Sequence, residues 1–192
     1  LLVGQKHVTA RSNPPAVKKE IPGIYCDLSA IAKGYAVDAV ADYLIDAGFA
    51  NFLVEIGGEV RAGGKKANGD AWRIGIASPV KSGGIQKVVR LSDTGMATSG
   101  DYFNYFEKDG KRYSHTIDPV TGHPVTHKLA SVTVIHPSCM TADGYATAID
   151  VMGPEKGFEF AQDRNLAVFM IVRSNGGFVE KMTPEFEAIF MK

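Results

Sequence analysis

Short stretches in which apolar and polar residues alternate, or in which apolar residues run together, recur along the chain and predict β-strands. The stretches are KHVTAR, GIYCDLSA (ending at Asp27 or Ser29), NFLVEIGGEVRAGG (broken at Gly57 and Gly58), AWRIGIASP, QKVVRLSDTGMATSG, SVTVIHP, LAVFMIV and the closing hairpin GGFVEKMTPEFEAIF. A turn signal at Asp109 and Gly110 predicts one further hairpin. Because strands that follow one another closely pair with their neighbours, a largely antiparallel sheet is expected.

Helical spacing of apolar residues predicts three helices. The first, from Ile31 to Ala47, stops at Gly48, and its expected buried stripe is Ala36, Val40, Tyr43, Leu44 and Ala47. The second contains SCMTADGYATAID and ends at Gly153 and Pro154, and its expected buried face is Ala142, Tyr145, Ile149 and Met152. The third runs roughly from Pro154 to Asn165. This order of strands and helices predicts an α+β fold in a single domain spanning residues 1–192.

Composition narrows the function classes. With 192 residues, of which 45% are hydrophobic, the chain can bury a sizeable core, and its longest apolar runs are too short to span a membrane. Lys plus Arg and Asp plus Glu are equal at 21 each, so the net charge provides no field that would attract nucleic acid. Cys26 and Cys139 lack zinc-site and redox-pair spacing and are expected to be free, buried thiols. Because the chain opens without Met or a signal-like segment, it is expected to be the C-terminal portion of a longer polypeptide.

Two segments combine polar side chains with a restricted backbone. In DLSAIAKGYAVD, Asp27 and Ser29 precede a helix that carries Lys33, and the free N–H groups of a helix N-terminus suit a phosphate or a flavin carbonyl. The alternative is that Asp27 or Ser29 only caps the helix and Lys33 is solvated. In YSHTIDPVTGHPV, His115 can act as an acid or base, and Asp118 can fix a turn by accepting backbone N–H groups. The alternative there is a turn with an incidental histidine.

A third candidate lies in the second predicted helix. Asp143 and Thr147 are four residues apart, so their oxygen atoms share one face and suit a hard cation such as Mg²⁺. Two side chains are too few, so main-chain carbonyls, water and substrate phosphates would have to complete the ligand set. The alternative is that Asp143 favours the helix dipole from the first turn while Thr147 bonds back to the helix. The weaker signal EIGGEV does not match a phosphate-binding loop; its glycines suit a bulge or a close approach of ligand to backbone.

Six blocks in a fixed order resemble the ApbE family, the FAD:protein FMN transferases, from about residue 20 to the end of the chain. The blocks are DLSAIAKGYAVD, LVEIGGEV, WRIGIASP, ATSGDYFNYF, GKRYSHTIDPVTGHPV and TADGYATAIDVMG. The resemblance implies an ApbE-like (T-fold-like) architecture whose N-terminal part lies outside this chain. It also implies an enzyme that uses Mg²⁺ to cleave the pyrophosphate of FAD, joins FMN through a phosphoester bond to a Thr or Ser of an acceptor protein, and releases AMP.

Matched block by block, the resemblance implies three kinds of site residue. They are FAD contacts at Asp27, Lys33 and Ile117; a histidine at His115 that assists the acceptor hydroxyl; and Mg²⁺ ligands from the side chains of Asp143 and Thr147 and the carbonyls of Ala30 and Ala146. Ala146 stands where some members carry an acid. Phosphoryl transfer requires stabilisation of negative charge, which a metal beside the pyrophosphate and a helix N-terminus facing the anion would provide.

Two alternative functions stay open. With water in place of the acceptor, the protein would be an FAD pyrophosphatase that gives FMN and AMP, and without chemistry it would be an FAD-binding or flavin-delivery protein. The family's acceptors include subunits of bacterial membrane redox complexes, and its bacterial members are mostly exported lipoproteins. The resemblance therefore implies a location on the periplasmic side of the inner membrane and an N-terminal lipid anchor outside this chain, while the balanced charge predicts no nucleic-acid partner.

Overall fold

A computed structural model of the chain describes residues 4–80, 83–100, 105–108, 111–114 and 116–190. Its strands are β1 (Val8–Ser12), β2 (Pro15–Lys19), β3 (Phe52–Ile56), β4 (Glu59–Gly63), β5 (Trp72–Ala77), β6 (Ile85–Leu91), β7 (Thr94–Gly100), β8 (Tyr105–Lys108), β9 (Lys111–Ser114), β10 (Leu129–His136), β11 (Ala167–Ser174) and β12 (Gly177–Met182). Its helices are α1 (Ser29–Asp46), α2 (Cys139–Met152), α3 (Lys156–Asp163) and α4 (Pro184–Phe190), with a short 3₁₀ turn, η1 (Gln5–His7). The α+β prediction is confirmed.

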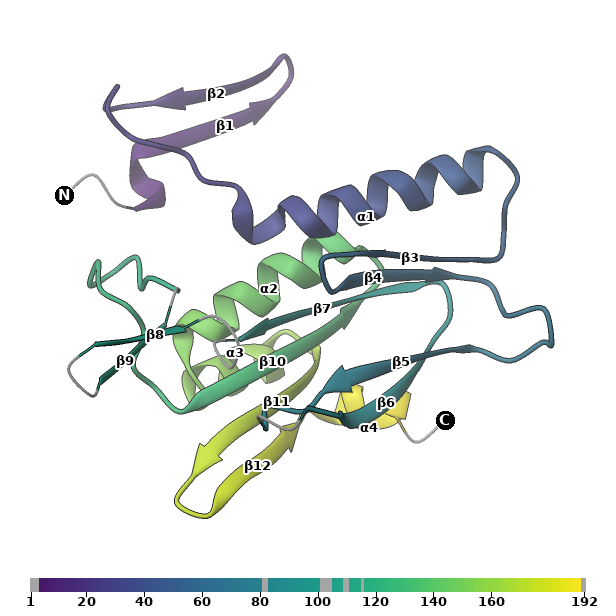
Figure 1. Cartoon of the computed structure of the whole chain (residues 1–192). Helices are drawn as coiled ribbons and strands as arrows, with labels where there is room; N and C mark the ends of the chain where they lie inside the picture. The colour runs from purple at the N-terminus through teal and green to yellow at the C-terminus, as the bar shows by residue number, and fades with distance from the viewer. Residues whose placement is uncertain (1–3, 81–82, 101–104, 109–110, 115, 191–192) are drawn as a thin grey trace.

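A six-stranded sheet in the order β12-β11-β10-β7-β4-β3 forms the centre, and every pairing between its described strands is antiparallel. Figure 1 shows α1 and α2 on one side of this sheet and the separate β5–β6 hairpin with α4 on the other. Strand β10 lies between these layers, so its residues are buried along nearly its whole length, on both faces. The β1–β2 hairpin projects beyond α1, away from the sheet (Figure 1).

Two strand predictions were wrong. Residues 24–28 of GIYCDLSA form no strand but an irregular segment that enters α1, because the Ile24 N–H closes a turn onto the Ile21 carbonyl and the Ser29 N–H bonds to Asp27. The closing stretch contributes β12 to a hairpin with β11, but residues 184–190 form α4. Pro184 at the first helical position and two glutamates in the first turn are the helix-start signals that account for this helix. The predicted turn at 109–110 lies outside the described residues.

The buried face of the first predicted helix was also wrong. Val40 is 43% exposed and Tyr43 is 72% exposed, whereas the buried residues of α1 are Gly34, Val37 and Ala41. Small residues on this face let α1 lie close against α2, so the larger side chains point away from the contact. On α2, Ala142 and Ile149 are buried as predicted, but Met152 is 38% exposed.

Both cysteines are free, as predicted, although Cys26 is exposed and only Cys139 is buried. Among the described residues, no helix is both long enough and apolar enough to cross a membrane.

Candidate functional site

Six of the eight predicted site residues line one cavity of about 610 Å³. Its wall is built by the start of α1, the end of β7, one face of α2 and the loop that follows β9. The lining residues are Asp27, Ser29, Ala30, Lys33, Thr98, Ser99, Gly100, Thr116, Ile117, Pro119, Asp143, Thr147 and Asp150. Segments more than 100 positions apart in the sequence therefore meet around one space.

The close crossing of α1 over α2 positions the central carboxylate of this cavity. The Gly34 N–H donates to Asp143 Oδ2 at 2.9 Å in a buried contact. A Cβ on Gly34 would lie 2.5 Å from the Cys139 carbonyl oxygen and 2.8 Å from Asp143 Cβ, so only glycine allows this approach. The geometry of the carboxylate is thus set by a backbone contact between two helices.

Asp143 is 3% exposed and is the fifth residue of α2, which has no acidic residue in its first turn. The helix-dipole alternative for this aspartate is therefore wrong. Burial raises the pKa of Asp143 above its usual value, while the Gly34 hydrogen bond and the Lys33 charge act in the opposite direction. A buried carboxylate of this kind favours a nearby cation.

Further oxygen atoms lie beside this carboxylate. Thr147 Oγ1 lies 3.3 Å from Ser99 Oγ on β7, so its hydroxyl faces the strand and does not serve only its own helix. In a regular helix the Ala30 carbonyl would accept the Gly34 N–H, and the bond from Gly34 to Asp143 competes for that proton. Among the described residues, no group of three or more His, Cys, Asp or Glu side chains is placed to hold a metal. A cation here would depend on one carboxylate with hydroxyl and carbonyl oxygens.

Asp27 lies at the exposed mouth of the cavity. Asp27 Oδ1 accepts the Ser29 N–H at 2.8 Å and also the Ser29 hydroxyl, which holds the pKa of the Asp27 carboxyl below its usual value. The residue at the N-cap position is Leu28, so neither Asp27 nor Ser29 occupies the position in which a capping role was predicted. Asp27 nevertheless satisfies one of the free N–H groups at the start of α1.

Lys33 has defined partners although its side chain is 47% exposed, so the alternative in which it is only solvated does not hold. Its Nζ lies 2.7 Å from Glu59 Oε2 and donates to the Gly57 carbonyl at 3.3 Å. Glu59 opens β4, directly after the two glycines of EIGGEV. The only sequence signal for the pair of Lys33 and Glu59 was an acidic residue that directly follows a glycine turn.

Asp150 is a second functional candidate that the sequence prediction missed. It is 2% exposed, lines the cavity and accepts the Thr116 hydroxyl at 3.1 Å. It follows Asp143 by seven residues and therefore lies on the same helix face, two turns on. The spacing of seven residues from Asp143 is the sequence signal that could have identified Asp150 as a site residue.

The remaining predicted residues have mixed outcomes. Ile117 lines the cavity, is 50% exposed and forms an isolated β-bridge with Pro124. Asp118 accepts the Val120 N–H at 2.8 Å, which confirms its predicted role in the turn. Ala146 packs in the core between α2 and the sheet and does not line the cavity. His115 lies outside the described residues.

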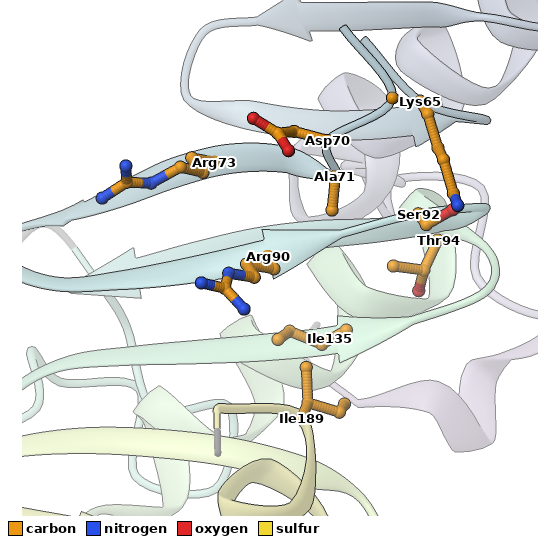
Figure 2. Close-up of a pocket in the computed structure, with 10 residues that line it drawn as sticks. Lys65, Asp70, Ala71, Arg73, Arg90, Ser92, Thr94, Ile135 and Ile189 are labelled. Carbon is orange, nitrogen blue, oxygen red and sulfur yellow. The ribbon is translucent and has the colours of Figure 1, made fainter. Parts of the chain in front are cut away.

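A larger cavity, of about 710 Å³, lies on the other side of the sheet and contains none of the predicted residues (Figure 2). Its basic side chains are Lys65, Arg73 and Arg90, and Asp70 is its acidic one. The lining is largely exposed surface, and its acidic residue, Asp70, labelled in Figure 2, is itself exposed. The smaller cavity is therefore the better candidate on chemical grounds.

Comparison with known proteins gives a consistent assignment. A model of the ApbE family matches residues 1–170. The FAD:protein FMN transferases of Vibrio cholerae serotype O1 and Haemophilus influenzae are 47% and 46% identical, with alignments that cover 100% and 97% of this chain but 57% and 55% of theirs. The crystal structure of Pseudomonas stutzeri flavinyl transferase ApbE, apo form, is 45% identical with a TM-score of 0.87, and the match covers 100% of this chain and 58% of that one. The chain thus spans a little over half the length of these relatives.

Proposed function

This chain belongs to the ApbE family, and from that premise we propose that it transfers the FMN part of FAD to a Thr or Ser hydroxyl of an acceptor protein and releases AMP. Its relatives from Vibrio cholerae and Haemophilus influenzae carry the name FAD:protein FMN transferase. The observation that carries the proposal is the gathering of Asp27, Ala30, Lys33, Ile117, Asp143 and Thr147 around one cavity.

The donor set of this cavity fits Mg²⁺. The Asp143 carboxylate, the Thr147 hydroxyl and the Ala30 carbonyl are oxygen ligands of the kind that Mg²⁺ prefers. When bound, Mg²⁺ would neutralise charge on the phosphate oxygens of the substrate. The buried Asp143 supplies the negative charge that such an ion needs.

The protein's own groups would orient the substrate. The N-terminus of α1 and the Lys33 ammonium face the cavity and suit the pyrophosphate, while Ile117 offers apolar surface to the flavin. In the reaction, the acceptor oxygen bonds to the phosphorus on the FMN side, and the bond from that phosphorus to the bridging oxygen breaks. AMP leaves with the bridging oxygen, and His115 takes the proton of the attacking hydroxyl.

The family also guides the proposal for partners and compartment. We infer an acceptor of the kind found in bacterial membrane redox complexes, and a location on the periplasmic side of the inner membrane. Modification of a purely cytoplasmic acceptor in cells, with a periplasmic acceptor left unmodified, would contradict this placement.

A product experiment tests the activity. The protein is incubated with FAD, Mg²⁺ and an acceptor that carries a short Asp-Gly-Ser/Thr-Ala-Thr type segment, the pattern that the family resemblance implies, and the products are separated by mass. An acceptor heavier by one FMN, with AMP, supports the transferase. Free FMN and AMP with an unmodified acceptor indicate a pyrophosphatase, and unchanged FAD indicates a binding protein; either result overturns the proposal.

A further inference from the structure

We propose that Glu59 is a positioning residue, a buried carboxylate that fixes the Lys33 ammonium at the wall between two adjoining cavities. The inference rests on the proposed function, because it assigns a role to Glu59 in that same site. It also gives a purpose to the EIGGEV segment, whose glycines match no phosphate-binding loop.

The turn that precedes Glu59 in the chain fixes its position. Glu59 is 1% exposed, and it follows Gly57 and Gly58, whose φ angles of 59° and 101° form the turn between β3 and β4. These backbone angles favour glycine, so the turn that delivers Glu59 into the interior depends on both glycines. A buried carboxylate is costly unless a charge or hydrogen bonds offset its lost hydration.

Lys33 provides that offset. Its Nζ lies 2.7 Å from Glu59 Oε2, and this oxygen receives no hydrogen bond with good angles from the described part of the chain. The same ammonium donates to the Gly57 carbonyl at 3.3 Å, and a Cβ on Gly57 would lie only 3.0 Å from Lys33 Cδ. The turn therefore packs against the lysine stem while the carboxylate holds its end.

Glu59 and Lys33 differ sharply in exposure, which distinguishes the residue that positions from the residue that can contact substrate. The Glu59 side chain is 2% exposed and that of Lys33 is 47% exposed. The carboxylate is thus out of reach of a ligand, whereas the ammonium remains open to one. A lysine has four rotatable bonds, and fixing it in advance avoids the entropy of ordering it in the transition state.

Lys33 stands where two cavities meet. The candidate site of about 610 Å³ and a neighbouring cavity of about 390 Å³ share Lys33, Thr98 and Gly100 in their linings. The Lys33 charge also acts on Asp143, whose carboxylate lines the larger of the two. One fixed cation therefore serves the buried Glu59, the metal-binding aspartate and an incoming phosphate.

Loss of Glu59 should affect turnover more than FAD binding. Without the carboxylate, Lys33 keeps its charge and can still attract the pyrophosphate, so the ground-state affinity stays about the same. The ammonium loses its fixed position, and stabilisation of the transition state depends on that position. If Glu59 had only a structural role, its substitution would lower the melting temperature and leave both kcat and KM unchanged.

Glu59→Gln tests the proposal, with Glu180→Gln as the matched control. Glu180 pairs with Lys87 at 2.8 Å, and neither residue lines the two cavities. For Glu59→Gln we expect kcat to fall by about tenfold or more, with the dissociation constant for FAD within about threefold of wild type. Glu180→Gln should leave both values unchanged. Equal kcat in Glu59→Gln and wild type would overturn the proposal.

A second readout does not require turnover and so separates this inference from the proposed function. Limited acetylation of lysines followed by peptide mass spectrometry should label Lys33 at least about threefold faster in Glu59→Gln than in wild type, because a paired and hydrogen-bonded amine is a poorer nucleophile. Glu180→Gln should speed labelling of Lys87 and not of Lys33. If wild type shows no turnover, the proposed function fails while the labelling still decides the role of Glu59. If Glu59→Gln does not fold, Glu59→Asp should lower kcat and speed the acetylation of Lys33, each by about threefold. No change in either readout would refute the role of Glu59.

Discussion

The crossing of α1 and α2 offers a sharp test, because Gly34 both allows the contact and donates to Asp143. We consider Gly34→Ala. The new Cβ would lie 2.5 Å from the Cys139 carbonyl oxygen, 2.7 Å from Met140 Cα and 2.8 Å from Asp143 Cβ. Two of these atoms belong to the backbone, so no side chain can rotate away, and the helices must separate by roughly 1 Å to restore normal contacts.

The magnitude follows from two opposing effects. Overpacking costs about 1–3 kcal/mol of the free energy of unfolding, and three contacts under 3.0 Å, two of them to backbone atoms, place Gly34→Ala in the upper part of that range, at about 2–3 kcal/mol. Alanine is a better helix former than glycine by about 1 kcal/mol, which offsets part of that cost. The expected net loss of about 1–2 kcal/mol corresponds to a fall in melting temperature of roughly 2–8 °C for a chain of this length.

Thermal unfolding, followed by circular dichroism with and without Mg²⁺ plus FAD, measures the effect. The control is Gly144→Ala on α2, where the one atom within 4 Å of a Cβ would be the Ile31 Cγ2 methyl, at 3.2 Å. This control should be neutral or stabilised by up to about 1 kcal/mol. Gly34→Ala should also lose most of the extra stability given by Mg²⁺ and FAD. A melting temperature equal to that of Gly144→Ala, or a full ligand effect, would refute the reasoning.

Three further predictions follow from other residues. Burial works against the charged form of Asp38, but the N–H groups of Met140 and Cys139, the Ser138 hydroxyl and the Arg61 charge together hold the pKa of Asp38 below its usual value. The stabilisation by ionised Asp38 is therefore present above about pH 4 and is lost as the pH falls through the lower pKa of the folded state. In urea titrations, the difference in unfolding free energy between wild type and Asp38→Asn should narrow from about pH 6 to about pH 3. A difference that stays constant over this range would contradict the prediction. Burial, with the nearby Asp38 charge, raises the pKa of Cys139 to about 12, so iodoacetamide at pH 8 should modify only the exposed Cys26 in the native protein and both thiols in denaturant, as counted by mass. His115→Ala should slow FMN transfer by about 10²-fold or more while FAD affinity stays within about threefold, and lost binding with normal transfer would contradict the assigned role.

Much of the framework could be predicted because strands and helices leave local patterns. The glycine break at Gly57 and Gly58 marked the β3–β4 turn, and Gly153 with Pro154 marked the end of α2. The buried face of α1 could not be predicted in the same way. Large apolar side chains are the usual marker of a core face, but here the close contact with α2 selects small residues such as Gly34 and Ala41.

The candidate site was partly predictable for a related reason. Asp143 and Thr147 share a helix face, so their proximity follows from sequence spacing alone. The bond from Gly34 to Asp143 joins residues 109 positions apart, and the contact of Lys33 with the β3–β4 turn depends on tertiary packing. No local pattern specifies such contacts. Only the family resemblance brought residues from α1 and α2 together in advance.

The central claim is that the cavity around Asp143 carries out Mg²⁺-dependent transfer of FMN. The most direct test measures the intact mass of an acceptor protein after incubation with FAD and Mg²⁺, using wild type and Asp143→Asn in parallel, with circular dichroism to show that both are folded. We expect the acceptor to gain the mass of one FMN with wild type and to stay unmodified with Asp143→Asn or with a chelator. Equal modification by both proteins, or by wild type in the presence of chelator, would contradict the account.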